Sequence, residues 1–118
     1  MLFTVTVDHR FEYLLVRASG PALLVDLYGY MDLVATIATH VGKRRAVLDL
    51  QDVEIKLSFT DHLNLGVYAS ERLRHLKRVA SIVSVANRSG NSEKAARQMG
   101  LQLKTFTSLE EGLDWIAG

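Results

Sequence analysis

Two short polar stretches hold the residue types that could do chemistry, and each follows an apolar run. The first is rich in carboxylates and hydroxyls, and the second holds amides and hydroxyls with one arginine. Each leads into a segment with helical periodicity, and the free N–H groups of a helix start attract anions. We therefore expect helix capping by Ser58 and Asn91, phosphorylation of Ser58 or Thr60, or anion binding by backbone N–H groups at these stretches. Their polar residues are Asp49, Asp52, Glu54, Ser58, Thr60 and Asp61, then Asn87, Arg88, Ser89, Asn91 and Ser92.

The first helix start supports two interpretations. Ser58 followed by Asp61 three residues later is a shortened capping box, and a cap of this kind contributes about 1 kcal/mol. Alternatively, Ser58 or Thr60 is a regulatory hydroxyl, since a phosphate there would carry a charge of about −1.5 to −2 and favour the helix dipole. Asp52 and Asp61 would oppose that phosphate. Both interpretations therefore stay open.

The second helix start could form a small phosphate-binding nest. In Arg88-Ser89-Gly90-Asn91-Ser92 a glycine stands between a strand and a helix, where successive backbone N–H groups can point into one concavity. The stretch lacks the lysine and the spacing of a Walker loop, and the chain holds no G-x-G-x-x-G motif. The alternative is that Asn91 is an ordinary helix cap. We therefore expect no nucleotide cofactor.

The sequence carries no catalytic or metal-binding motif. It has no cysteine, which excludes disulfides, thiolate catalysis and zinc–thiolate sites. Its histidines, His9, His40, His62 and His75, are never three or four residues apart, so metal-ligand spacing is missing. Asp61 and His62 are adjacent, and adjacent residues on a helix do not face each other. We expect no catalytic, cofactor or metal site. A hydrolase or transferase would instead place a histidine within hydrogen-bond reach of a serine in a pocket.

Length and composition predict one folded domain over residues 1–118. Hydrophobic residues make up 48% of the chain, enough to build a core, and the net charge of +1 indicates no particular partner. No apolar run approaches the roughly 20 residues of a membrane span, and the first residues alternate like a strand and not like a signal peptide. We expect a cytoplasmic protein without nucleic-acid binding or stable membrane insertion.

Hydrophobic periodicity predicts strands and helices that alternate along the chain. The expected strands are residues 2–7, 11–18, 46–50, 79–85 and 101–106, with a loop at 51–57. Helices are expected to start at Ser19-Gly20-Pro21, at Ser58, at Ser92 and after Ser108, where Glu111 completes a capping box. The helix after Ser58 should bury Leu63, Gly66, Val67, Ser70 and Leu73. The order β-β-α-β-α-β-α-β-α predicts an α/β fold with a mixed, mostly parallel five-stranded sheet and four helices.

This sheet would have two chemically different edges. Loops that leave the C-terminal ends of parallel strands share one edge, where ligands of open α/β folds bind, so both polar stretches should meet there. The opposite edge should collect His75 and half of the 14 lysines and arginines: Lys43, Arg44, Arg45, Arg72, Arg74, Lys77 and Arg78. These cations either stabilise helix C-termini, by about 0.3–1 kcal/mol each, or contact anionic lipid or an acidic partner. No aromatic platform for single-stranded nucleic acid accompanies them.

The order of elements and two local stretches resemble the STAS domain, the SpoIIAA-like fold of bacterial anti-sigma factor antagonists. In that family a strand ends in Asp-Leu and a helix then opens with Asp-Ser-Ser-Gly-Leu-Gly-Val. Here Asp49-Leu50 ends a strand, and Asp61 and Leu65-Gly66-Val67 match the helix motif. His62 and Leu63 replace the two serines, one of which is the family's phosphorylation site, so the phospho-switch does not carry over. The stretch 106–116 resembles the ending of a divergent, uncharacterised SpoIIAA-like branch.

The resemblance implies a non-enzymatic regulatory or protein-interaction module. Its expected surface runs from Asp52 to Gly66, with Arg88, Ser89 and Asn91 nearby. The expected partner is a protein such as a regulatory kinase or an anti-sigma-like factor.

Two further hypotheses belong to other classes. A carrier of a small apolar or lipid-like ligand is implied by analogy with Sec14-type domains, and Tyr28, Met31 and Trp115 would line its pocket unless they are plain core. Two copies of the chain could also pair through an exposed hydrophobic helix face or through the outer edge strand.

Overall fold

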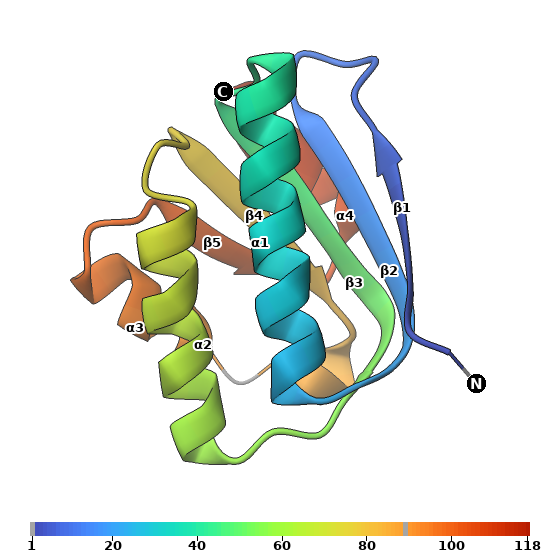
Figure 1. Ribbon diagram of the computed structural model, residues 1–118, viewed down its shortest axis with the longest axis vertical. Helices are drawn as coiled ribbons and strands as arrows, with labels where there is room; N and C mark the ends of the chain where they lie inside the picture. Colours follow the sequence, from blue (N-terminus) through green and yellow to red (C-terminus); the bar gives the residue numbers. More distant parts are fainter. Residues whose placement is uncertain (1, 89) are drawn as a thin grey trace.

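A computed structural model that describes residues 2–88 and 90–118 places a five-stranded sheet at the centre of the protein. Its strands lie in the order in which they occur in the sequence. The edge strand β1 is antiparallel to β2, and β3, β4 and β5 follow in parallel (Figure 1). The predicted mixed, mostly parallel sheet is confirmed. The strands are β1 (Thr4–Asp8), β2 (Leu14–Ala22), β3 (Arg45–Ile55), β4 (Arg78–Val83) and β5 (Leu103–Phe106).

Helices cover the two faces of the sheet unequally. Helices α1, α2 and α3 lie on one face and α4 lies on the other (Figure 1). Parallel strands that follow in order, joined by right-handed crossovers, place their connecting helices on the same face. The predicted four helices are confirmed in the described part of the chain: α1 (Leu24–Val41), α2 (Phe59–Arg72), α3 (Asn91–Gln98) and α4 (Leu109–Ala117), with a short 3-10 helix η1 (Val85–Asn87) after β4.

Two hydrophobic clusters hold these layers together. The larger lies between the sheet and helices α1, α2 and α3, and the smaller lies between the sheet and α4. Ala46 and Leu48 of β3 belong to the larger cluster and Val47 to the smaller, because successive side chains of a strand point to opposite faces. The central strands are therefore apolar on both faces, which explains the continuous apolar runs in their sequences.

Strand β2 extends through Ser19-Gly20-Pro21, so the predicted helix start at these residues is wrong. Gly20 has a φ of 99°, and a Cβ there would lie 2.3 Å from the carbonyl oxygen of Leu2. The chain before β1 thus passes β2 where only glycine leaves room. Pro21 lies beyond the last residue of β2 that pairs with β1, so its missing N–H breaks no bond with that strand. Helix α1 begins only at Leu24.

Strand β3 continues to Ile55, so the predicted loop over residues 51–57 is wrong for most of its length. The pairing of β3 with β2 shifts register between Asp49 and Asp52, which is a β-bulge. Beyond the bulge, Val53 and Ile55 pack into the larger cluster. Asp52 alternates with them and is exposed, so it points to the opposite face of the sheet, away from α2.

Helix α2 buries a face that differs from the predicted one by two residues. Gly66, Ser70 and Leu73 are buried as expected, whereas Leu63 is half-buried and Val67 is exposed. Leu65 and Ala69 take the inner positions instead. A Cβ at Gly66 would lie 2.3 Å from the backbone oxygen of Ser92, so α2 packs directly against the backbone of α3.

Basic residues at the N-terminal edge of the parallel strands bind the end of α4. Arg45 Nη1 donates a hydrogen bond to the carbonyl oxygen of Ile116 at 2.7 Å, and Arg78 Nη1 donates to that of Trp115 at 2.8 Å. Arg78 also lies over the Trp115 ring, 5.2 Å from its centroid. These contacts support the interpretation that the cations stabilise a helix C-terminus.

The remaining element boundaries shift by a few residues. Val85 belongs to η1 and not to β4, α3 starts at Asn91, and β5 starts at Leu103. At the predicted cap of α4, the N–H of Glu111 donates to Ser108 Oγ at 3.3 Å. None of the helices in residues 2–88 and 90–118 combines the length and the apolar character that a bilayer crossing requires.

Candidate functional site

The C-terminal edge of the parallel strands brings together the starts of α2 and α3. Ser58, Thr60, Asp61 and His62 lie at the start of α2, and Asn91 lies at the start of α3. Arg88 lies exposed in the connection between η1 and α3, while Ser89 falls outside the described residues. Asp52 is not part of this group, since it points to the other face of the sheet. The predicted convergence is therefore correct for the residues at the two helix starts and in η1, but not for three carboxylates of β3. Glu54, like Asp52, alternates with Val53 and Ile55 and points to the other face of the sheet. Asp49 is buried within β3, where Arg17 Nε lies 3.3 Å from its Oδ2.

The start of α2 is capped within the chain. The N–H of Asp61 donates to Ser58 Oγ at 3.1 Å, and the N–H of Ser58 donates to Asp61 Oδ2 at 3.3 Å. This reciprocal pair is the predicted capping box. It occupies the Ser58 hydroxyl and places a carboxylate at the positive end of the helix dipole, where an added anion would meet repulsion.

A histidine and a serine join the two helix starts. Ser92 Oγ donates to the carbonyl oxygen of His62 at 2.9 Å and lies 3.3 Å from His62 Nδ1. Partial burial lowers the pKa of His62 below its ordinary value of 6.5, and the nearby Asp61 carboxylate opposes that shift. His62 is therefore predominantly neutral at pH 7.

The geometry of this pair fits a structural clamp and not an activated nucleophile. Because the Ser92 hydroxyl proton is directed at the His62 carbonyl, Nδ1 must carry the proton that bridges to Ser92 Oγ. A nucleophilic serine requires the opposite arrangement, in which the imidazole accepts the hydroxyl proton. The contact places a histidine beside a serine, as a hydrolase would, but with the polarity that holds α2 against α3.

A small cavity lies beneath these helix starts, between α2 and the sheet. Its volume is about 70 Å³, and its deep wall is apolar, with Leu27, Met31 and Leu48 among the lining residues. His62 and Ser92 line its polar side. Ligand pockets usually measure about 300–1,000 Å³, so this space accommodates a few water-sized groups and not a lipid chain.

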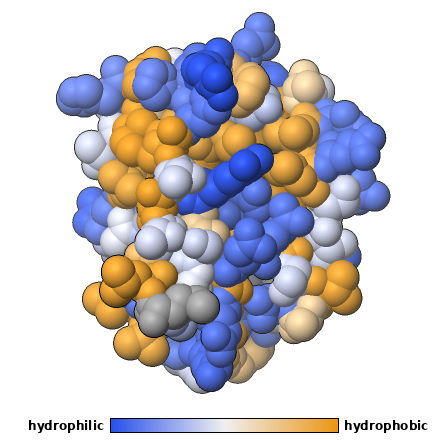
Figure 2. Space-filling model, turned by 90° about the vertical axis from the view of Figure 1, so that its right-hand side faces the viewer, coloured by the Kyte–Doolittle hydropathy of each residue, from blue (hydrophilic) through white to orange (hydrophobic). Residues whose placement is uncertain are grey.

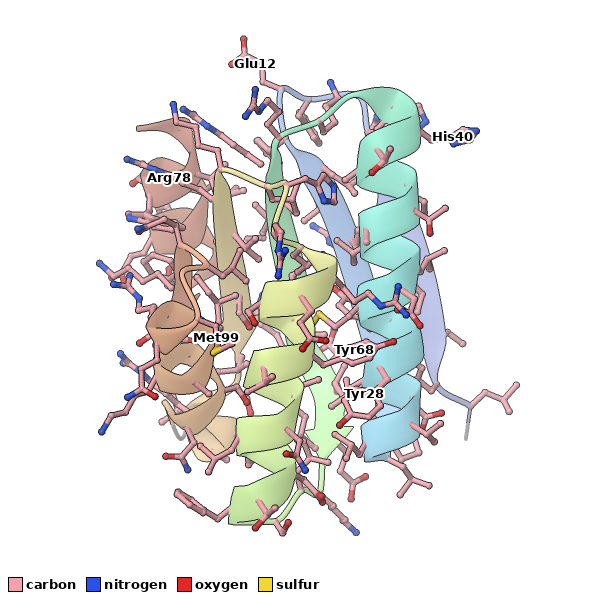
Figure 3. The ribbon with its side chains drawn as sticks, turned by 60° about the vertical axis from the view of Figure 1, so that its left-hand side comes forward. Glu12, Tyr28, His40, Tyr68, Arg78 and Met99 are labelled. Atoms are coloured by element: carbon pink, nitrogen blue, oxygen red, sulfur yellow. The ribbon has the colours of Figure 1, made fainter. Side chains whose placement is uncertain are left out.

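The three aromatic and sulfur-containing residues proposed for a carrier pocket do not line one cavity. Met31 lines the cavity under α2, whereas Trp115 packs against Phe106 on the α4 face. Tyr28 stacks on Tyr68 with ring centroids 4.3 Å apart, and the two side chains point toward one another between α1 and α2 (Figure 3). The hypothesis of a shared pocket is wrong, because Tyr28 and Met31 pack in the larger cluster on one face of the sheet and Trp115 packs in the smaller cluster on the other.

Apolar side chains are exposed at the same C-terminal edge. Phe59, the first residue of α2, is 63% exposed, and Val85, the first residue of η1, is 80% exposed. Each follows a parallel strand, which places both at this edge (Figure 1). Neither residue was among the predicted site residues. The available signal was an apolar residue directly after a cap, outside the apolar stripe of its helix.

Metal ligation receives no support from the geometry. Within residues 2–88 and 90–118, no three histidine, aspartate or glutamate side chains gather in a group that could hold a metal ion.

Comparison with known proteins identifies the fold. The sequence matches no model of a protein family and no curated protein. An anti-sigma factor antagonist from Mycobacterium paratuberculosis has a similar structure, with a TM-score of 0.65 and 17% identity, over 99% of this chain and 96% of that one. An uncharacterised protein with a SpoIIAA-like fold from Shewanella loihica has a TM-score of 0.59 and 23% identity, over 97% and 93% of the two chains. Unphosphorylated SpoIIAA, an anti-sigma factor antagonist, has a TM-score of 0.57 and 13% identity, over 98% and 97%. The chain therefore has the SpoIIAA-like fold of STAS domains, as the resemblance implied.

Proposed function

We propose that this protein is a non-enzymatic, cytoplasmic regulatory module that binds a protein partner through the C-terminal edge of its sheet. The exposure of Phe59 and Val85 beside a helix start that is already capped carries this proposal. Exposed apolar side chains next to polar groups are the composition of a protein-binding surface. Because Ser58 and Asp61 satisfy each other, the edge needs no anion for its stability.

The class of partner is inferred from proteins with the same fold. Two of the similar structures are anti-sigma factor antagonists, which supports an anti-sigma-like factor or a regulatory kinase as the partner. Ser58 Oγ is engaged in the cap, whereas Thr60 is exposed at the same helix start. We therefore favour Thr60 over Ser58 as the hydroxyl that such a kinase would modify, and Arg88 and Asn91 as neighbouring contact residues.

Affinity capture with matched variants tests the binding surface. Phe59→Asp should abolish capture of a specific partner from a lysate of the native host, because it puts a charge in the centre of the apolar contact. An acidic residue in the first turn suits the helix dipole, so α2 should remain folded. Met99→Asp is the matched control, since Met99 is 59% exposed and follows the last residue of α3 at the opposite end of that helix.

The two variants distinguish binding at the C-terminal edge from binding elsewhere on the protein. Loss with Phe59→Asp and retention with Met99→Asp would support the assigned surface, provided that both variants show the circular dichroism of the wild type. Equal capture by all three proteins would show that the C-terminal edge is not the binding surface.

A carrier function receives less support from the geometry. The cavity of about 70 Å³ would have to grow several-fold to hold a lipid-like molecule, which requires α2 to move away from the sheet. The carrier hypothesis stays a prediction. Native mass spectrometry of protein purified from its own host would test it, because a carrier should retain a bound small-molecule mass.

A further inference from the structure

The outward face of α1 is a surface helix face without formal charge. Val25 is 68% exposed and Leu33 is 37% exposed, and no lysine, arginine, aspartate or glutamate lies among the exposed residues of this helix. The solvent side of a surface helix normally carries charged residues. Helix α1 covers the sheet in the foreground of Figure 1, so this face points directly away from the core. The exposed residues of α1 are Val25, Gly29, Leu33, Thr36, Thr39 and His40.

Both acidic residues of α1 are engaged within the chain. Asp26 Oδ2 accepts a hydrogen bond from the N–H of Leu23 at 2.8 Å, at the start of the helix. Asp32 Oδ1 accepts from the Tyr68 hydroxyl at 2.7 Å and pairs with Arg72 Nε at 2.9 Å. On the side of α1 that faces α2, Asp32 therefore interacts with two residues of α2. Arg72 thus neutralises the charge of Asp32, whereas Asp26 keeps its charge and uses it to cap the helix start.

Gly29 lies in the middle of this face and has no packing role within the chain. Among residues 2–88 and 90–118, a Cβ built at Gly29 would meet no atom of another element within 4 Å, so packing within the described chain does not require a glycine there. A glycine in a helix interior lowers helix stability relative to alanine. Close approach of another backbone is the physical reason for such a residue, because glycine lets two helices cross at short distance.

We propose that the outward face of α1 is a homodimer interface, in which α1 of a second copy crosses antiparallel about a two-fold axis near Gly29. The spacing is self-complementary, since Val25 and Leu33 lie four residues to either side of Gly29. A two-fold axis at Gly29 sets Val25 of each copy against Leu33 of the other, as an isologous interface requires. The same axis sets Asp26 of each copy opposite Asp32 of the other, and Arg72, which pairs with Asp32, offsets the repulsion between these two carboxylates.

The edge strand β1 is the competing place for self-association, and it fits less well. On the side of the molecule that carries β1, hydrophobic patches are interrupted by hydrophilic side chains (Figure 2). Near the end of that strand, Asp8 and Arg10 form an exposed ion pair at 2.6 Å. A second copy on β1 would have to accommodate these charged groups, whereas the face of α1 presents none.

Cysteine cross-linking tests the antiparallel register. The chain has no cysteine, so single substitutions report on one position each. A mixture of Val25→Cys and Leu33→Cys proteins should form the mixed disulfide in clear excess over either homodimer under mild oxidation. A mixture of Val25→Cys and Met99→Cys, with the control cysteine far from the axis, should not. Equal yields of all pairings would overturn the proposed register and the interface with it.

Sedimentation velocity tests the dimer without cross-linking. Over concentrations from about 1 μM to about 1 mM, the wild type should shift from monomer to dimer, and Leu33→Glu should weaken the association by about tenfold or more. Met99→Glu should behave as the wild type. A wild type that stays monomeric throughout overturns the proposal. A monomer that instead floats with vesicles of phosphatidylcholine and phosphatidylglycerol, and loses this flotation with Leu33→Glu, also overturns it and assigns the face of α1 to a lipid surface.

Discussion

Replacing Gly66 by alanine should destabilise the protein through a clash with α3. A Cβ at this position would lie 2.3 Å from the backbone oxygen of Ser92 and 2.8 Å from the Cβ of Ala95. Ordinary contacts between such atoms lie near 3.5 Å, so the backbone of α3 would have to move by about 1 Å. Both helices bury their inner faces in the core, and Ala95 and Ala96 of α3 are buried, so that movement disturbs packing.

The size of the effect follows from two opposing terms. Overpacking in a well-packed site costs about 1–3 kcal/mol, and we place Gly66→Ala at the upper end because the obstructing oxygen belongs to the backbone. The gain in helix propensity from glycine to alanine is about 1 kcal/mol. The net loss in the free energy of unfolding is therefore about 2 kcal/mol, or a fall in Tm of about 6–10 °C for a chain of this length.

Gly29→Ala is the matched control, because it makes the same chemical change where the added Cβ would have no neighbour within 4 Å in the part of the chain that the structure describes. It should raise the free energy of unfolding of the monomer by about 0.5–1 kcal/mol. Urea unfolding followed by circular dichroism at low micromolar concentration measures both variants with the monomer predominating. A Gly66→Ala protein as stable as the wild type would refute the close approach of α2 and α3. Parallel shifts of the two variants would show that helix propensity alone decides.

Three further predictions concern the cap of α2, the partly buried His62 and the contacts of Arg78 with the end of α4. Ser58→Ala should lower stability by about 1 kcal/mol in thermal unfolding, whereas Ser58→Asp, also a good cap, should leave it nearly unchanged. Burial lowers the pKa of His62 below 6.5, so the unfolded chain binds a proton more readily, and stability should fall as the pH drops from 6.5 through the folded-state pKa; His62→Gln should flatten that slope in urea unfolding at pH 5–7.5. Arg78→Met should cost about 1–2 kcal/mol in the same assay through its lost contacts with the end of α4, and Lys77→Met, at an exposed neighbour, should stay within about 0.5 kcal/mol of the wild type.

Local chemistry was predictable from the sequence wherever the interacting groups lie close together in the chain. The capping box of Ser58 and Asp61 spans three residues, and its hydrogen bonds form as predicted. The order of strands and helices follows from hydrophobic periodicity, which each segment carries by itself. That order also implied the shared C-terminal edge, because parallel strands with right-handed crossovers leave few alternatives.

The local sequence led to wrong predictions of secondary structure where tertiary contacts override the propensities of the residues. Ser19-Gly20-Pro21 has the residue types of a helix start, yet pairing with β3 extends β2 through these residues. Gly20 is needed there because the backbone of Leu2 leaves no room for a Cβ. The polar composition of residues 51–55 indicated a loop, yet their backbone completes β3 beyond a bulge. Aspartate is depleted in strands and common in turns, so Asp52 indicated a loop, yet an exposed strand position tolerates it.

The sequence by itself determined the order of elements, the helix caps and the edge at which the polar stretches meet, since these depend on neighbours a few residues apart. Only the tertiary structure decided which groups touch across that edge. His62 and Ser92 are thirty residues apart and meet because Gly66 lets α2 lie against α3. Likewise, the exposure of Phe59 and the uncharged outward face of α1 depend on what the rest of the fold covers. Burial and long-range contact are properties of the packed chain, which no local pattern encodes.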